Sequence, residues 1–123
     1  MARLLVDTSV WVDHLRRGDE ALVLALEHDA VVMHPHIVGE LALGSLKDRI
    51  AVLELLRNLP KTVVATDDEV QTMIEEFSLF GRGIGYTDAH LLAAARLTTD
   101  AKLWTRDRRL RTVARDLGVD TPH

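Results

Sequence analysis

The feature that most constrains the fold is the repeated alternation of short apolar runs with longer amphipathic segments. The first run, Leu4-Leu5-Val6, ends directly in Asp7 and precedes a segment with helical spacing of apolar residues. Short apolar runs of this kind are typical of strands buried on both faces, and their alternation with helices predicts a parallel sheet. We therefore expect an α/β fold, with three layers (α/β/α) around a central, mostly parallel sheet of four to five strands.

The expected elements follow from composition and from start and stop signals. Strands are expected at residues 3–7, 30–33, 62–65 and 101–105, with a short fifth strand near Val119. Helices are expected after Ser9, after Asp19, from Pro35, over 48–59, after Thr66, after Thr87 and over 107–117. The chain has no internal repeat and no linker rich in Pro, Gly or Ser, so residues 1–123 are expected to form one domain.

Composition narrows the class of protein. The chain has 123 residues and no cysteine, which excludes disulfide frameworks, thiolate metal sites and cysteine nucleophiles. It has no apolar stretch near the ~20 residues of a membrane span and no secretory signal sequence, so we expect a cytoplasmic protein without membrane contact. The net charge of −4 does not by itself favour nucleic acid, although four arginines lie within residues 106–111.

Four acidic residues are candidates for one site. Asp7 ends the first predicted strand, and Asp107 follows the strand predicted at 101–105 by two residues. Asp88 begins a predicted helix after a glycine-rich loop, and Glu40 lies in the helix after the second predicted strand. Each alone has a plain structural explanation, such as an acid at a helix start. Because strand ends and the following helix starts meet at one edge of a parallel sheet, we expect these side chains to converge there.

Converging carboxylates need protons or a cation. Two carboxylates about 5 Å apart repel by roughly 3 kcal/mol at an effective dielectric constant of 20. A hard divalent ion, Mg²⁺ or its substitute Mn²⁺, suits a site made of oxygen ligands only. The hydroxyls of Thr8 or Ser9 and of Thr105 are expected to orient the acids.

The motifs around these acids resemble a known family. They are Asp-Thr-Ser-Val-Trp from Asp7, Gly-Glu-Leu-Ala-Leu-Gly around Glu40, Thr-Asp-Ala-His-Leu-Leu-Ala-Ala-Ala around Asp88, and Thr-Arg-Asp ending at Asp107. In this order they resemble the PIN-domain ribonucleases, and most closely the VapC toxins of type II toxin–antitoxin systems. The resemblance covers essentially the whole chain. Each motif is weak alone, and the four together are specific.

The resemblance implies a PIN-like fold and a Mg²⁺-dependent endoribonuclease toxin that cleaves structured RNA such as tRNA or rRNA. It implies a cognate VapB-like antitoxin that neutralises the toxin, and usually a homodimer. The catalytic residues would be Asp7, Glu40, Asp88 and Asp107. Asp7 and Asp88 would be the direct metal ligands. The expected reaction is metal-assisted hydrolysis of a phosphodiester bond.

Binding surfaces are expected on both sides of the acids. Arg82, Arg106 and Arg108 are expected to bind the RNA backbone. Base stacking is expected to be minor, because the chain has few aromatic residues. Apolar helix faces within residues 10–26 and 41–56 exceed what a small core needs. We therefore expect a helix of the antitoxin to dock there and to direct a basic side chain toward the acids.

Two other functions fit part of the pattern. A phospho-receiver domain also has an acidic Mg²⁺ pocket on an α/β fold, but it needs paired acids after its first strand and a lysine at the end of its last core strand. Here Thr8 and Ser9 follow Asp7, and Lys102 lies at the entering end of its predicted strand. The other alternative is a non-catalytic module that keeps the fold only to bind a partner protein. The presence of all four acids argues against it.

Two further motifs are left outside the site. The histidines of His34-Pro35-His36 are two residues apart, a spacing that rarely serves one metal ion. The glycines at 81, 83 and 85 follow a predicted helix and lack the spacing of a dinucleotide fingerprint. We interpret the glycine segment as a hinge that leaves room for Asp88 and RNA.

Overall fold

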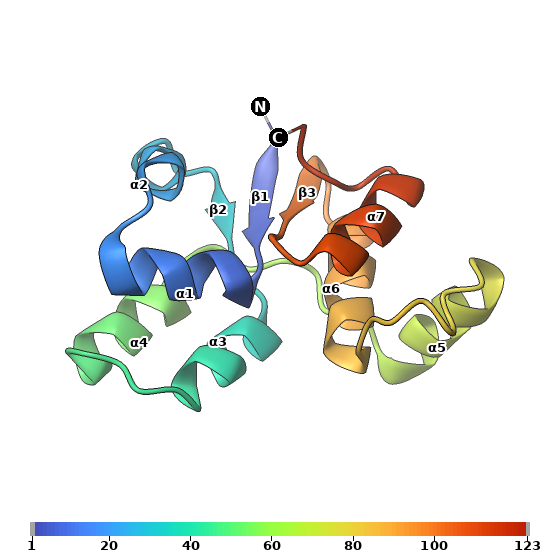
Figure 1. Cartoon of the computed structure of the whole chain (residues 1–123), viewed down its shortest axis with the longest axis horizontal. Coiled ribbons are helices and arrows are strands. Elements are labelled where there is room, and N and C mark those ends of the chain that lie inside the picture. Colours follow the sequence, from blue (N-terminus) through green and yellow to red (C-terminus); the bar gives the residue numbers. More distant parts are fainter. Residues whose placement is uncertain (1, 123) are drawn as a thin grey trace.

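The sheet has three parallel strands in the order β2-β1-β3. The structure is a computed structural model that describes residues 2–122. The strands are β1 Arg3–Val6, β2 Val31–Val32 and β3 Ala101–Trp104. The central strand β1 places Leu5 beside Val32 on one side and Leu103 on the other. All three strands point the same way, so their carboxyl ends share one edge of the sheet, as predicted (Figure 1).

The prediction of an α/β fold with a parallel sheet is confirmed, but the prediction of four to five strands is not confirmed among residues 2–122. The segment 62–65 forms no strand, and beside it only Lys61 makes an isolated bridge, to Met33. Its Thr62 N–H still donates to the Met33 carbonyl (3.0 Å), but the next N–H, of Val63, donates to Oγ1 of Thr98 (2.9 Å), so no ladder of bonds continues along the segment. The segment near Val119 is likewise reduced to one isolated bridge, between Leu103 and Asp120.

Seven helices connect the strands within the described residues. They are α1 Thr8–Arg17, α2 Glu20–Glu27, α3 Pro35–Ala42, α4 Arg49–Arg57, α5 Asp67–Glu76, α6 Tyr86–Leu97 and α7 Arg108–Asp116. Helices α1 to α4 lie to one side of β1 and α5 to α7 to the other in Figure 1. The helix α6 packs on both β3 and α5 and is buried along most of its length, including Leu91 and Leu92. None of the helices in residues 2–122 could cross a membrane.

Several helix starts agree with the predictions. The side chain of Asp19 accepts the N–H of Leu22 (3.0 Å) at the start of α2, and Pro35 occupies the first turn of α3. At the start of α5, Thr66 and Glu69 bond each other's backbone N–H in a capping box. These local pairings stabilise helix starts by satisfying N–H groups that have no partner within the helix.

Two helix starts differ from the predictions, and both differences concern the acids. The helix α1 starts at Thr8 with Asp7 as its N-cap, so Ser9 is not the cap. The helix α6 starts at Tyr86 with Gly85 as its N-cap, so Thr87 is not the cap. Asp88 is therefore the third residue of its helix, where its side chain can fold back onto the Gly85 N–H. This backbone bond is the physical reason for the earlier start.

Candidate active site

Asp7 is held rigidly at the carboxyl end of β1. Its N–H donates to the carbonyl of Trp104 (2.8 Å), which fixes the backbone between β1 and β3. Its side chain is buried, and Oδ2 accepts hydrogen bonds from Oγ of Ser9 (2.8 Å) and Oγ1 of Thr105 (2.7 Å). Hydrogen bonds to a carboxylate are among the stronger ones in proteins, so the orientation of this side chain is well defined.

Glu40 reaches the same edge of the sheet from α3. Its Oε1 accepts a hydrogen bond from Oγ1 of Thr8 (2.8 Å), and Thr8 directly follows Asp7. The glutamate is exposed, unlike Asp7. The bond to Thr8 places the Glu40 carboxylate next to the residue that follows Asp7. All three hydroxyls expected to orient the acids, those of Thr8, Ser9 and Thr105, donate to one of these carboxylates.

The pKa of Asp88 is affected by the other three acids. Its carboxylate is partly buried, and Oδ2 accepts the N–H of Gly85 (3.0 Å). Burial raises the pKa of Asp88, and the negative charges of Asp7, Asp107 and Glu40 raise that pKa further, while the Gly85 N–H opposes the shift. Four carboxylates from β1, α3, α6 and the start of α7 therefore share one electrostatic environment.

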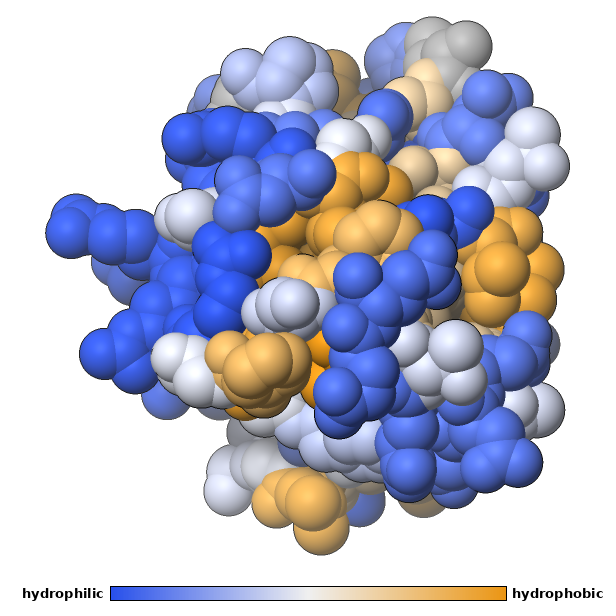
Figure 2. Space-filling model, turned by 90° about the vertical axis from the view of Figure 1, so that its right-hand side faces the viewer, coloured by the Kyte–Doolittle hydropathy of each residue, from blue (hydrophilic) through white to orange (hydrophobic). Residues whose placement is uncertain are grey.

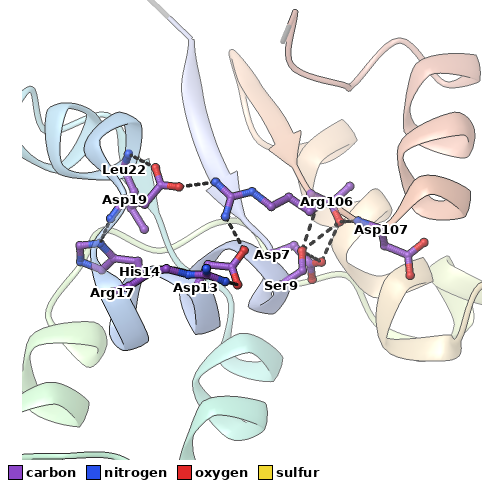
Figure 3. Close-up of polar contacts among 10 residues, drawn as sticks. Asp7, Ser9, Asp13, His14, Arg17, Asp19, Leu22, Arg106 and Asp107 are labelled. Atoms are coloured by element: carbon purple, nitrogen blue, oxygen red, sulfur yellow. Dashed lines mark hydrogen bonds and ion pairs between the residues drawn. The ribbon is translucent and has the colours of Figure 1, made fainter.

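Asp107 is linked to Asp7 through one threonine. It is the N-cap of α7, where Oδ1 accepts the N–H of Leu110 (3.0 Å), and its own N–H donates to Oγ1 of Thr105 (3.1 Å). The same Thr105 hydroxyl donates to Asp7. In Figure 3 the Asp107 carboxylate points away from the Arg106 side chain. Asp107 thus lies at the exposed margin of the group.

The donor set fits a hard divalent cation. The hydrogen bonds described above occupy one oxygen of each carboxylate, and the second oxygen takes no part in them. Across residues 2–122, no three histidine or acidic side chains lie close enough together to enclose an ion by themselves. Mg²⁺ commonly binds through only one or two carboxylates and keeps several waters. That Asp7 and Asp88 hold such an ion stays a prediction, and a cation beside Asp88 would offset the repulsion from the neighbouring carboxylates.

Arg106 is already paired by two acids. Its Nη1 donates to Asp13 of α1 (2.6 Å), and Nη2 donates to Asp19 at the start of α2 (Figure 3). The hydrogen bond from Arg106 lowers the pKa of Asp19, and the two acids raise the pKa of Arg106. The N–H of Arg106 also donates to Oγ of Ser9 (3.1 Å). This side chain therefore joins the end of β3 to α1 and α2.

The other two predicted RNA-binding arginines differ in position. Arg82 pairs with Asp116 (2.7 Å), at the opposite end of α7 from Asp107. Arg108 is exposed in the first turn of α7, and its side chain forms no ion pair within the described part of the chain. Arg108 is thus the predicted arginine whose charge stays available beside the acids.

Sequence reasoning did not find two groups of side chains near the site. Asp13 and Asp19 were missed as partners of Arg106, because nothing in their spacing relates them to β3. The imidazole rings of His34, His36 and His90 also pack together. The centroid of the His36 ring lies 4.9 Å from that of His34 and 4.7 Å from that of His90. Burial, followed by the charges of the other two histidines, lowers the pKa of His34 to about 4. Only the fold brings His90 to the other two.

Comparison with known proteins identifies the family to which the chain belongs. The chain matches the family model of the PIN domain over residues 4–116 and therefore belongs to the PIN-domain family. It is similar to the protein named ribonuclease VapC32 from two strains of Mycobacterium tuberculosis, CDC 1551 / Oshkosh and ATCC 25618 / H37Rv. Each relative is 48% identical over 116 residues, which cover 94% of both chains. The prediction of a VapC-type PIN domain is confirmed, and the name ribonuclease of both relatives agrees with the predicted enzyme class.

Proposed function

We propose that the chain is a divalent-metal-dependent endoribonuclease and the toxin of a toxin–antitoxin pair, acting in the cytoplasm on structured RNA such as tRNA or rRNA. The hydrogen-bonded Asp7 carboxylate carries this proposal, because it is buried at the carboxyl edge of the sheet and held there by the Ser9 and Thr105 hydroxyls. The charges of Asp7, Asp107 and Glu40, which raise the pKa of Asp88, support it. The ribonuclease name of two relatives at 48% identity supports the same activity. One catalytic domain over residues 1–123 remains the expected organisation.

Each of the four acids would have its own role in metal-assisted hydrolysis. Asp7 and Asp88 would hold Mg²⁺, or Mn²⁺ in its place. When bound, such an ion lowers the pKa of a water molecule and polarises the scissile phosphate. The Ser9 and Thr105 hydroxyls fix Asp7 in advance, so it needs no rearrangement to bind. Glu40, whose carboxylate accepts the Thr8 hydroxyl, and Asp107 would orient a water molecule or help to hold a second ion.

Cleavage-site mapping tests the proposal. Total RNA is incubated with the wild type and with Asp7→Asn, each with Mg²⁺ and with excess EDTA. We expect specific cleavage by the wild type in Mg²⁺ only, and a loss of at least about 100-fold in Asp7→Asn. Asp68→Asn is the matched control, since it makes the same chemical change at an exposed acid of α5. Full cleavage in EDTA would eliminate the proposed mechanism.

A groove beside Glu40 supports the proposed antitoxin partner. It has a volume of about 610 Å³ and lies between α1, α3 and the start of α4. Its apolar residues include Val12, Leu41 and Val52, and Glu40 lies in the same lining. An apolar partner helix in this groove would bring a basic side chain within reach of Glu40. If the co-purified complex and the free protein cleaved RNA equally fast, inhibition through this groove would be wrong. The homodimer remains a prediction, to be checked by sedimentation.

A further inference from the structure

A small hollow with aromatic walls lies next to the acidic site. It has a volume of about 170 Å³, room for one flat heterocyclic ring, and it lies between the end of α5, the glycine loop and the start of α6. Its lining includes Phe80, Ile84, Gly85 and Tyr86. Phe80 is 64% exposed and Tyr86 45% exposed, so both rings present apolar surface to solvent at the hollow. Apolar surface lies among polar side chains on the side that carries α5 to α7 (Figure 2).

Tyr86 is fixed as one wall of this hollow. Its hydroxyl donates to Oδ1 of Asp67 (2.7 Å), a bond that raises the pKa of Tyr86. Its ring packs edge-on against His90, with centroids 4.8 Å apart and an interplanar angle of 88°. His90 in turn lies 3.0 Å from the same Asp67 oxygen. An aromatic ring held from two sides loses little entropy when another ring stacks on it.

The hollow lies next to Asp88, one of the two proposed metal ligands. Gly85 lines the hollow, and its N–H donates to Oδ2 of Asp88. A Cβ atom at Gly85 would lie 3.8 Å from that oxygen. A ring in the hollow is therefore about one residue away from Asp88.

The positively charged side chain of Arg109 lies across the loop that contains Gly83. The side chain of Arg109 crosses Gly83 so closely that a Cβ there would lie 2.7 Å from the guanidinium. Gly83 also has a φ of +79°, a conformation that a residue with a side chain rarely adopts. Glycine is thus required here twice, for the turn and for the approach of Arg109. This arrangement places a positive charge beside an apolar hollow, and a nucleotide has the complementary pair of groups.

We infer that the hollow binds one unpaired nucleobase of the substrate RNA, adjacent to the cleaved phosphodiester, and that Phe80 and Tyr86 determine which base is accepted. The inference rests on the proposed ribonuclease function. Stacking on aromatic side chains is how proteins commonly bind the bases of single-stranded RNA. It revises the expectation from composition that base stacking is minor, because the fold brings two exposed rings to one hollow beside Asp88.

Photo-crosslinking tests the inference without depending on catalysis. Short single-stranded RNAs carrying 5-iodouracil at one position at a time are bound to Asp7→Asn and irradiated. We expect one position to crosslink to Phe80 or Tyr86. Phe80→Ala should weaken RNA binding by about 10-fold, typical of one stacked base, while Phe80→Trp retains it. Leu97→Ala is the matched control, because Leu97 is an exposed apolar residue of α6 (47%) outside the hollow, and it should bind as Asp7→Asn does.

The outcomes separate the two proposals. If the wild type cleaves RNA but Phe80→Ala keeps full affinity and the same cleavage sites, base binding in the hollow is wrong and the ribonuclease proposal remains. If the wild type neither binds nor cleaves RNA, both are wrong. If Phe80→Ala converts a sedimenting dimer to a monomer, the hollow is a contact between two copies, and base binding there is also wrong.

Discussion

The hydroxyl of Thr105 is the most informative group to remove. It donates to Oδ2 of Asp7 (2.7 Å) and accepts the N–H of Asp107 (3.1 Å), so it connects two acids of the site. Both Thr105 and Asp7 are buried, at 6% and 7% exposure. Thr105→Val keeps the volume and the branched shape of the side chain while removing the hydroxyl and both of these hydrogen bonds. The variant therefore separates the effect of the hydroxyl from that of packing.

The expected loss follows from the burial and charge of the pair. A hydrogen bond to a charged group contributes about 1.5–3 kcal/mol, and Oδ2 of Asp7 keeps the Ser9 hydroxyl (2.8 Å) in the variant. We expect the free energy of unfolding to fall by about 2 kcal/mol. For a chain of this size the melting temperature would fall by roughly 6–10 °C. A less constrained Asp7 should also bind Mg²⁺ about 10–100-fold more weakly.

Urea unfolding without metal and a Mg²⁺ titration measure the two effects. Thr112→Val is the matched control, because the Thr112 hydroxyl is exposed and bonds only the Arg108 carbonyl of its own helix (3.0 Å). That control should change stability by less than about 0.5 kcal/mol. A Thr105→Val variant with the wild-type urea midpoint and the wild-type Mg²⁺ affinity would refute the reasoning, since Asp7 would then not depend on this hydroxyl.

Two further predictions concern charge. The raised pKa of Asp88 means that its contribution to stability is present at low pH and is lost as pH rises through the folded-state pKa. Without metal, Asp88→Asn should therefore be more stable than the wild type at pH 7, and urea unfolding in EDTA should show the difference vanishing below about pH 4. Arg106→Gln should lose about 1 kcal/mol of stability, less in 1 M NaCl, because its pairs with Asp13 and Asp19 are partly exposed. Arg108→Gln should keep its stability and bind RNA more weakly with a shallower salt dependence, and equal salt slopes for both variants would contradict this division of roles.

The acids were predictable because their position along the chain already places them at one edge. Asp7 follows a strand, Asp107 follows another, and Asp88 and Glu40 lie in helices that start at the same edge. A parallel sheet brings strand ends together whatever its exact number of strands. The missing strand at 62–65 therefore did not affect the site. Its apolar composition was compatible with a strand, but Val63 and Val64 are half exposed and the N–H of Val63 bonds Thr98 instead.

The arginines were less predictable, because a basic run in the sequence does not show which charges are already paired. Arg106 lies one residue from Asp107, yet its charge is matched by Asp13 and Asp19 on other helices. The same limit applies to aromatic residues. Their small number predicts little stacking, but a count does not show that the fold brings Phe80 and Tyr86 to one hollow.

The sequence by itself determined the α/β class and the family and predicted the four acids, because these depend on periodicity and on the order of motifs along the chain. Only the tertiary structure decided which hydroxyl holds which carboxylate, which arginine remains free, and that His90 joins His34 and His36. Those properties depend on contacts between segments far apart in the chain, and the strength of each contact depends on burial. Burial is a property of the packed fold and not of any local pattern.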